Sequence, residues 1–208
     1  MNIVSLIKRY GLIGIIENLV FKSLRIIGYD EFQIMRLLRF DLKGANKPMT
    51  KNPLIQRINW EDFKQCSYND TSRFNETLMR QLKKRYEEEN KRGELCYGVI
   101  SHETIVAYAW ISLYYYPRSM DALPVKSAFI YDDYTHPDFR GKGYHKQLIE
   151  YRLYALQKMG YNTAYASVDL FNKASLKGFL KAGFTECSKY RMWRNRNNEV
   201  KTSFCISE

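Results

Sequence analysis

The organisation of this chain of 208 residues is set by residues 128–184, which read AFIYDDYTHPDFRGKGYHKQLIEYRLYALQKMGYNTAYASVDLFNKASLKGFLKAGF. The aromatic, extended run from Ala128 to Thr135 predicts a strand, which Pro137 ends. The sequence RGKG at residues 140–143 then predicts a tight turn. Apolar residues recur after this turn at helical spacing and predict an amphipathic helix of about sixteen residues. They are Leu148, Ile149, Leu153 and Leu156.

This strand, turn and helix predict a binding site for a diphosphate. The N–H groups in the first turn of a helix have no partner within the helix and carry the positive end of its dipole. Gly141 and Gly143 allow a phosphate to approach the backbone, and Arg140 and Lys142 add positive charge. The motif G-x-x-x-x-G-K-[ST] is absent, and Lys146 replaces the last glycine of G-x-G-x-x-G. On these residues alone, an ordinary charged loop that enters a helix is the alternative.

A second, shorter helix is predicted near the end of the stretch. Asn172 is a good N-cap, and Gly183 is a typical C-terminal stop. The run Tyr161–Asp169 before it predicts another strand. The apolar residues of the helix predict a buried stripe, which consists of Leu176, Phe179 and Leu180.

These motifs, in this order, resemble the GCN5-related N-acetyltransferases, the GNAT superfamily. The acetyl-CoA loop of that family has the pattern [QR]-x-x-G-x-[GA], which Arg140, Gly143 and, imperfectly, His145 match. The later family pattern N-x-x-[AS]-x-x-x-[YF]-x-x-x-G-F is matched by Asn172, Ser175, Phe179, Gly183 and Phe184. The resemblance covers roughly residues 54–208. It implies an α/β fold with a mixed, mostly antiparallel sheet that splays near Asp133 and is flanked by helices.

The resemblance implies acetyl-CoA as acyl donor and direct transfer of an acetyl, or another short acyl group, to a primary amine. An amino sugar, a peptide N-terminus, a lysine and a polyamine all remain open as acceptors. A basic protein suits a neutral or anionic acceptor, such as a nucleotide-linked amino sugar. The residues expected to bind acyl-CoA are Tyr134, Thr135, Arg140, Gly141, Lys142, Gly143, Tyr144, His145, Asn172, Ser175 and Phe179.

Two positions depart from the family pattern. His145 replaces a Gly or Ala, so its side chain must turn away from the phosphates or hydrogen-bond to one of them. Phe179 replaces a Tyr that protonates the departing thiolate in many members, and it has no proton to give.

The catalytic candidates lie in the strand before the turn. Transfer to an amine requires a group that removes its proton and a group that stabilises the oxyanion. The resemblance places Asp133 where the acetyl carbonyl is held, and Asp133 and Asp132 are both candidate bases or anchors for the amine. Adjacent strand residues face opposite sides, so Tyr131 is expected beside Asp133 as a proton donor, unless a bulge intervenes. Alternatively, both aspartates only cap the strand end and pair with Lys or Arg.

Composition limits the partners without choosing among them. The formal charge of +11 suits an anionic CoA tail, a nucleic acid or an anionic membrane surface. A nucleic-acid-binding protein is therefore one rival function, although no base-reading motif supports it. The other rival is a non-catalytic acyl-CoA-binding module, which the missing Tyr at position 179 supports. The four cysteines are widely spaced and form no metal pattern, which favours free thiols in a reducing cytoplasm and no metal site.

Residues 1–50 are predicted to form a helical extension and linker, and residues 51–208 the acetyltransferase domain. The longest uncharged run near the start, Tyr10–Ile16, is far shorter than the roughly twenty residues that span a bilayer. Basic amphipathic helices over residues 2–27 are expected to pack on the domain, to form a homodimer or to touch the inner face of the membrane. A short helix is predicted at Phe32–Leu38. Further strands are predicted at 55–58, 94–101, 104–115, 185–193 and 200–206, and helices from 59 and over 72–90.

Overall fold

The structure, a computed structural model, describes residues 29–44, 52–67, 74–87, 93–117, 121–195 and 200–205. The chain forms two compact units, each assembled from separate stretches of sequence. Of the described residues, the first unit contains 29–38, 167–177, 186–195 and 200–205. The second unit contains the described residues within 39–166, together with 178–185.

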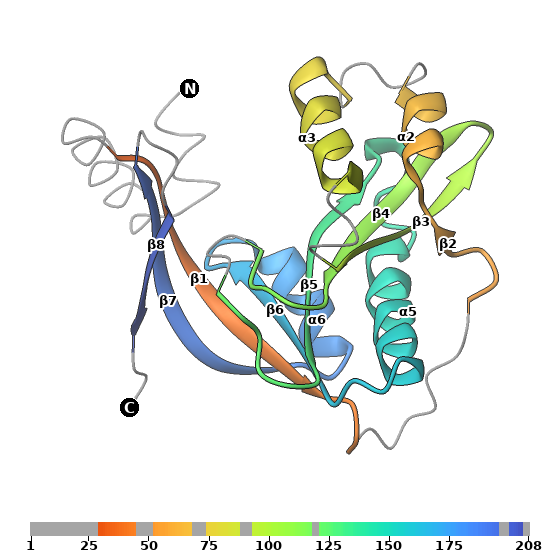
Figure 1. The fold of residues 1–208 in the computed structure, drawn as a ribbon. Helices are drawn as coiled ribbons and strands as arrows, with labels where there is room; N and C mark the ends of the chain where they lie inside the picture. Colours follow the sequence, from red (N-terminus) through yellow and green to blue (C-terminus); the bar gives the residue numbers. More distant parts are fainter. Residues whose placement is uncertain are drawn as a thin grey trace. The chain divides into compact units, whose positions relative to one another are not determined.

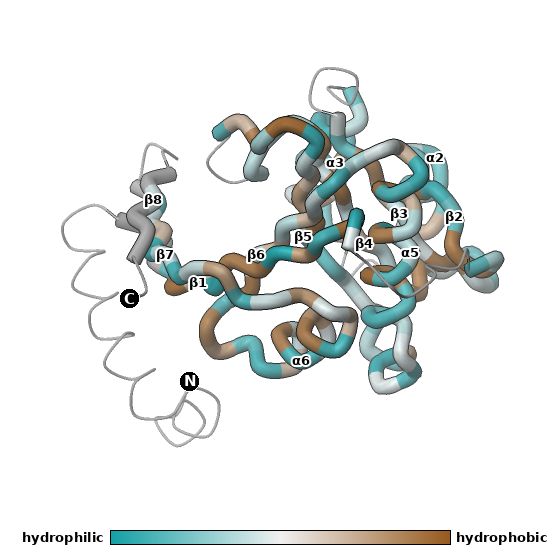
Figure 2. Tube along the Cα trace, turned by 90° about the horizontal axis from the view of Figure 1, so that it is seen from below, coloured by the Kyte–Doolittle hydropathy of each residue, from teal (hydrophilic) through white to brown (hydrophobic). Residues whose placement is uncertain are grey.

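The second unit is built on a mixed sheet with the strand order β2-β3-β4-β5-β6. The strands are β2 (Gln56–Arg57), β3 (Glu94–Ser101), β4 (Thr104–Ser112), β5 (Ser127–Thr135) and β6 (Thr163–Asp169) (Figure 1). Neighbouring strands are antiparallel except β5 and β6, which are parallel. The predicted α/β fold with a mixed, mostly antiparallel sheet is therefore confirmed. Buried and partly exposed residues alternate along β6, which Figure 2 shows as alternating hydropathy.

A β-bulge interrupts the pairing between β4 and β5. Tyr108 of β4 opposes Tyr134, but Trp110 opposes Tyr131, so a single residue of β4 faces two residues of β5. Those two residues are the predicted site aspartates, and the first of them, Asp132, has a φ of 53°. Non-glycine residues rarely adopt this left-handed conformation. The extra residue alters which side chains of β5 face each side of the sheet.

Helices cover both faces of this sheet. Helices α2 (Trp60–Ser67) and α3 (Glu76–Glu87) pack on one face, where the aromatic side chains of Tyr108 and Trp110 lie in the core. Helix α5 (Tyr144–Lys158) packs on the other face, through Leu148 among others (Figure 1). The predicted apolar face of α5 is confirmed, since Leu148, Ile149, Leu153 and Leu156 are all buried.

The second predicted helix is α6 (Lys173–Lys181). Asn172 caps it as predicted, because its Oδ1 accepts a hydrogen bond from the Ser175 N–H at 3.1 Å. Of the predicted buried stripe, only Phe179 is buried: Leu176 is partly exposed, and 47% of Leu180 is exposed. A short 3-10 helix, η1 (Pro137–Phe139), lies between β5 and the glycine turn.

The first unit contains a strand where a helix was predicted. The run predicted as a helix at Phe32–Leu38 lies inside β1 (Tyr29–Asp41). Beside the end of β6, the strand order is β1, then β7 (Thr185–Asn195), then β8 (Val200–Cys205). The prediction failed because the hydrogen-bonding partners of β1 lie far away in sequence and leave no local periodicity. The last two strands confirm the pair predicted at 185–193 and 200–206.

The predictions for the start of the chain are only partly addressed. The helices predicted over residues 2–27 and most of the predicted linker lie outside the described residues. The division between residues 1–50 and 51–208 stays a prediction, although β1, from the predicted extension, is a strand of the sheet. Along the described ranges, no helix is long and apolar enough to cross a membrane.

Candidate functional site

The glycine turn connects β5 and η1 to α5 and leaves the N-terminus of that helix open. Gly141 and Gly143 have φ values of 78° and 83°, which glycine adopts without steric cost. Gly143 is the N-cap of α5 and makes no side-chain cap, while its carbonyl accepts the first helical hydrogen bond, from the Gln147 N–H. A side chain at Gly141 would meet no atom within 4 Å. The backbone of the turn therefore faces open space.

The basic side chains of the turn are held beside this space. The Arg140 Nε donates to the Thr135 carbonyl at 3.2 Å, which ties the turn to the end of β5. The Lys142 ammonium lies 4.7 Å from the centroid of the Phe139 ring. Tyr144 packs against the same ring. In the part of the chain that the structure describes, neither cation contacts a carboxylate, so both can pair with a bound anion.

His145 turns its imidazole toward the sheet, which answers the question raised by its departure from the family pattern. Its Nε2 lies 3.0 Å from Asp133 Oδ2. Its ring packs edge-on against Phe179, with the centroids 5.6 Å apart. A Cβ at Gly178 would lie only 2.7 Å from the His145 Nδ1, so glycine at that position makes room for the ring. Phe179 itself is buried against Phe184.

Asp133 is a buried anchor on the α5 side of the sheet. Its Oδ1 lies 2.6 Å from Nη2 of Arg152, whose side chain is 0% exposed. Burial favours the neutral carboxyl, but the charge of Arg152 and the hydrogen bond from His145 outweigh it and hold the pKa of Asp133 below its ordinary value. The Arg152 Nη1 also donates to the carbonyls of Trp110 at 3.0 Å and Tyr131 at 3.5 Å. Arg152 thus connects β4 and β5 beside the bulge.

Asp132 points to the opposite side, toward α3. Its Oδ2 lies 2.8 Å from the Arg85 Nη1, and the two side chains are 33% and 27% exposed. The Arg85 guanidinium lies over two rings, 5.1 Å from the centroid of Trp110 and 5.6 Å from that of Tyr131. The Tyr131 hydroxyl donates to Glu94, and burial raises the pKa of Tyr131 well above its ordinary value.

Because of the bulge, the prediction that Tyr131 and Asp133 face the same side of the sheet is wrong. Tyr131 and Asp133 were expected to share a face, but Tyr131 lies with Asp132 on the α3 side, whereas Asp133 lies against α5. The physical reason is the extra residue, which breaks the alternation of side chains along β5. Tyr134 returns to the α2 and α3 side, where it packs on Phe74 with the centroids 6.4 Å apart.

The parallel ladder of β5 and β6 ends just before the bulge. Its last pair is Ile130 with Ala166, so residues 131–135 have no partner from β6 in that ladder. The sheet was predicted to splay near Asp133, which lies three residues further on. The edge of β5 that carries the bulge is therefore released from its parallel neighbour.

Some predicted site residues lie outside the second unit, and some residues near the bulge were not predicted. Asn172 and Ser175 belong to the first unit, and their part in acyl-CoA binding stays a prediction. Arg85, Glu94 and Arg152 were not singled out. Arg152 had a local signal, because it lies four residues after Leu148 on the apolar face of α5. In the described ranges, no group of three or more His, Cys, Asp or Glu side chains is placed to hold a metal ion.

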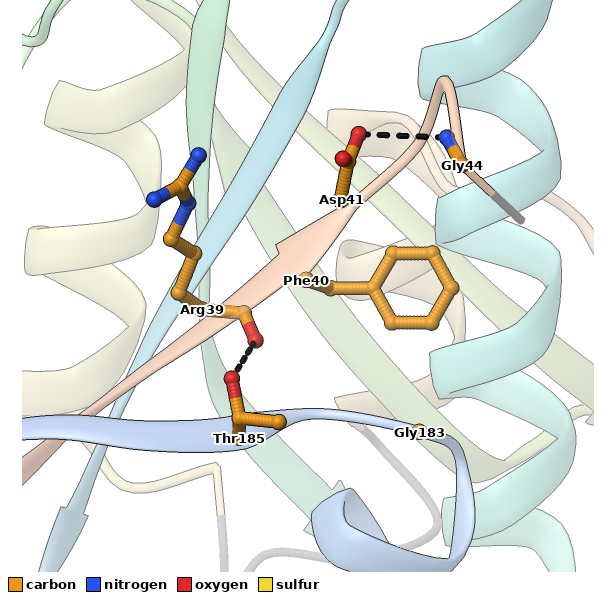
Figure 3. Close-up of a pocket in the computed structure, with 6 residues that line it drawn as sticks. All are labelled: Arg39, Phe40, Asp41, Gly44, Gly183 and Thr185. Carbon is orange, nitrogen blue, oxygen red and sulfur yellow. Dashed lines mark hydrogen bonds between the residues drawn. The ribbon is translucent and has the colours of Figure 1, made fainter.

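A separate pocket of about 490 Å³ lies elsewhere in the second unit (Figure 3). Two hydrogen bonds join residues that line it: the Thr185 hydroxyl donates to the Arg39 carbonyl at 3.3 Å, and the Gly44 N–H donates to the Asp41 carboxylate at 3.3 Å. None of the predicted site residues lines it. The pocket is lined by Arg39, Phe40, Asp41, Gly44, Gly183 and Thr185.

Fold and sequence together define the class of this protein. The model of the acetyltransferase (GNAT) family matches residues 54–184, more than half of the chain. The chain therefore belongs to the GNAT family of acetyltransferases. No curated protein matches the sequence.

Several solved structures share the fold. An acetyltransferase from the GNAT family from Colwellia psychrerythraea is 16% identical, with a TM-score of 0.52 over 90% of this chain and 62% of that protein. A GCN5-related N-acetyltransferase from Sphaerobacter thermophilus is 13% identical, with a TM-score of 0.50 over 93% and 57%. A conserved protein of unknown function from Staphylococcus epidermidis is 13% identical, with a TM-score of 0.53 over 85% and 67%. The chain spans less than two thirds of the length of the first two.

Proposed function

We propose that this protein is an N-acetyltransferase that moves an acetyl, or another short acyl group, from acetyl-CoA directly to a primary amine of a small molecule, such as an amino sugar. The observation that carries the proposal is the succession of a bulged strand, a left-handed glycine turn and an open helix N-terminus within one compact unit. Membership of the GNAT family supports the same reading.

In this proposal the diphosphate of acetyl-CoA binds at the N-terminus of α5. The N–H groups of Tyr144, His145 and Lys146 precede the first helical hydrogen bond, and they favour an anion there. Arg140 and Lys142 add charge from the turn. Pantetheine then lies along the end of β5 at Tyr134 and Thr135. The later family motif supports Asn172, Ser175 and Phe179 as further acyl-CoA residues.

The two aspartates take different parts in the proposed reaction. Both oxygens of Asp133 are held, one by Arg152 and one by His145, and its lowered pKa makes it a weak base. We therefore assign removal of the amine proton, directly or through a water, to the partly exposed Asp132. Asp133 positions the bulge beside the acetyl carbonyl.

Protonation of the departing thiolate is a smaller demand than removal of the proton from the amine. The Tyr131 hydroxyl already donates to Glu94, so it does not serve as the acid. A CoA thiol has a pKa close to the cysteine reference of about 8.5, whereas an amine like that of lysine has a pKa near 10.4. The removal of the amine proton is therefore the harder step, and a missing acid at Phe179 is tolerable.

The test combines binding with turnover. Acetyl-CoA is titrated by calorimetry into the wild type and into Arg140→Glu, Gly143→Trp and, as a control at the far end of α5, Lys158→Glu. We expect only the control to retain wild-type affinity. The release of free thiol and the acetylated product are then followed with a panel of amines.

Each rival function predicts a different result. Acetyl-CoA binding without thiol release from any amine would indicate an acyl-CoA-binding module. Absence of acetyl-CoA binding, with a strongly salt-dependent affinity for DNA or RNA, would indicate a nucleic-acid-binding protein.

A further inference from the structure

The ion pair between Arg85 and Asp132 has unused hydrogen-bonding capacity at an accessible surface. A guanidinium carries several N–H donors, and a carboxylate has two acceptor oxygens. Among the described residues, one hydrogen bond joins the two side chains, from Arg85 Nη1 to Asp132 Oδ2. About a third of each side chain is exposed, at 27% and 33%. A small molecule can therefore reach both a cation and an anion at the same place.

The aromatic side chains beneath Arg85 hold its guanidinium in position. Trp110 and Tyr131 both lie within cation–π distance of it. Tyr131 is itself fixed through its hydrogen bond to Glu94. An arginine fork that is already oriented loses little side-chain entropy when it binds a carboxylate through two parallel hydrogen bonds.

Backbone strain places the Asp132 carboxylate on this surface. Its φ of 53° is unfavourable for a non-glycine residue, and the bulge that contains it brings Asp132 to the same side as Tyr131, beside Arg85. Strained residues tend to gather at functional sites. Since Asp133 follows at the expected position of the acetyl carbonyl, an amine held by Asp132 lies beside the acyl carbon.

The charge balance of the pair discriminates among amines. A simple ammonium that binds Asp132 approaches the like charge of Arg85 and must share or displace its partner. An unpaired cation at a partly buried site is costly. An amine that also carries a carboxylate avoids this cost, because its own carboxylate replaces Asp132 as the partner of Arg85.

We propose that the acceptor is an amine with a carboxylate on a neighbouring carbon, recognised by Asp132 and Arg85 together. This inference rests on the proposed function, since it names the acceptor class for the same site. Amino acids and amino sugars that carry a carboxylate both fit this chemistry.

The experiment compares matched acceptors that differ only in the carboxylate. Amino acids are paired with their amides, and amino uronic acids with the corresponding amino sugars, and kcat/KM is measured with acetyl-CoA. We expect the acids to be better acceptors by about 10- to 100-fold, the scale of a hydrogen bond to a charged group. Arg85→Gln should abolish this preference, and Arg85→Lys should retain part of it.

The control is Arg80→Gln, on the same helix. Arg80 pairs with Glu76 at an exposed position and should leave the preference unchanged. The acetyl-CoA affinity and the melting temperature of each variant show whether it is folded. If Arg85→Gln does not fold, the comparison rests on Arg85→Lys and Asp132→Asn. Equal kcat/KM for acids and amides, or a preference that survives loss of Arg85, would overturn the inference.

A failure of the proposed function has a different signature. If acetyl-CoA binds but no amine is acetylated, the same acid and amide pairs are titrated into the CoA-saturated protein. Tighter binding of the acids that depends on Arg85 upholds the inference while transfer is rejected. Equal binding of acids and amides overturns it.

Discussion

Asp132 and Asp133 are neighbours in one strand, yet their environments differ in almost every respect. Asp133 lies in the interior against α5, and both of its oxygens are held by cationic or hydrogen-bonding partners. Asp132 lies on the α3 side, partly exposed, and among the described residues its ion-pair partner is Arg85. One is tied to the fold, and the other is open to a ligand. The two aspartates therefore differ in exposure and in charge partners, although they are identical neighbours in the sequence.

The bulge places Asp132 on the same side as Tyr131, and Arg152 lies beside the bulge. In a regular strand, Tyr131 and Asp133 would share one side, and Asp132 would lie on the other. Here, one residue of β4 faces both aspartates, and a buried guanidinium binds the carbonyls of Trp110 and Tyr131 beside the irregularity. Substitutions of Arg152 and of Asp132 therefore test the environments of Asp133 and Asp132 separately.

The largest effect is expected for Arg152→Ala. It removes the partner of a buried carboxylate and the donor to two strand carbonyls, so the free energy of unfolding should fall by about 3–5 kcal/mol. Urea denaturation measures this value, with Arg80→Ala as an exposed control. A loss of less than about 1 kcal/mol, the range of surface ion pairs, would show that Asp133 is not an anchor.

Asp133→Asn should cost less, about 1–3 kcal/mol at neutral pH, because Arg152 keeps its carbonyl partners. The effect should depend on pH in a defined direction. The folded pKa of Asp133 is lowered, so its ion pair stabilises the protein above its unfolded pKa of about 3.9. This contribution is lost as the pH falls from there through the folded pKa. Urea midpoints at several pH values should converge for wild type and variant at acid pH; a constant difference would contradict the assignment.

Asp132→Asn should affect turnover and hardly affect stability. Its ion pair is partly exposed, so the free energy of unfolding should change by less than about 1 kcal/mol. Turnover should fall by about 10²-fold, the scale for a positioned base, with the acetyl-CoA affinity unchanged. If Asp133→Asn instead lowers turnover and leaves stability unchanged, Asp133 is the base and the assignment of Asp132 is wrong.

Phe179→Tyr should have the smallest effect. The ring packs on His145 and Phe184, on the side of the sheet that holds Asp133. If that side only positions the strand, an added hydroxyl should leave turnover within about 2-fold of wild type, far below the 10²-fold scale of general acid–base catalysis. A 10-fold gain in the thiol-release assay would show that the Asp133 side also carries chemistry.

The features that the sequence predicted well are local ones. The glycine turn needs only Gly141 and Gly143, and the apolar face of α5 needs only residues three and four apart. Asn172 caps its helix through a contact to Ser175, three residues away. Such contacts leave a signature within a short window of sequence, which is why the turn and its helices were placed correctly.

The features that were missed depend on distant partners. Arg152 lies on the apolar face of α5, but its burial requires Asp133 from β5. The bulge is visible only in the register between β4 and β5. The strand nature of β1 depends on neighbours such as β7, where Cys187 contacts the Leu37 carbonyl. Local periodicity places Arg152 on the apolar face of α5, but it shows neither the partner of Arg152 nor the bulge nor the strand.

The position of β1 in its sheet has a consequence for biosynthesis. It is translated long before β7, since Arg36 of β1 pairs with Glu186, which lies 150 residues later. At about 5–20 residues per second, the nascent strand waits on the order of 10 seconds for β7. During that time the unpaired strand, which includes the apolar Met35, Leu37 and Leu38, is a template for pairing with other chains. We therefore expect a product that ends before Thr185, and so lacks the β7 neighbour of β1, to aggregate more readily than the 208-residue chain.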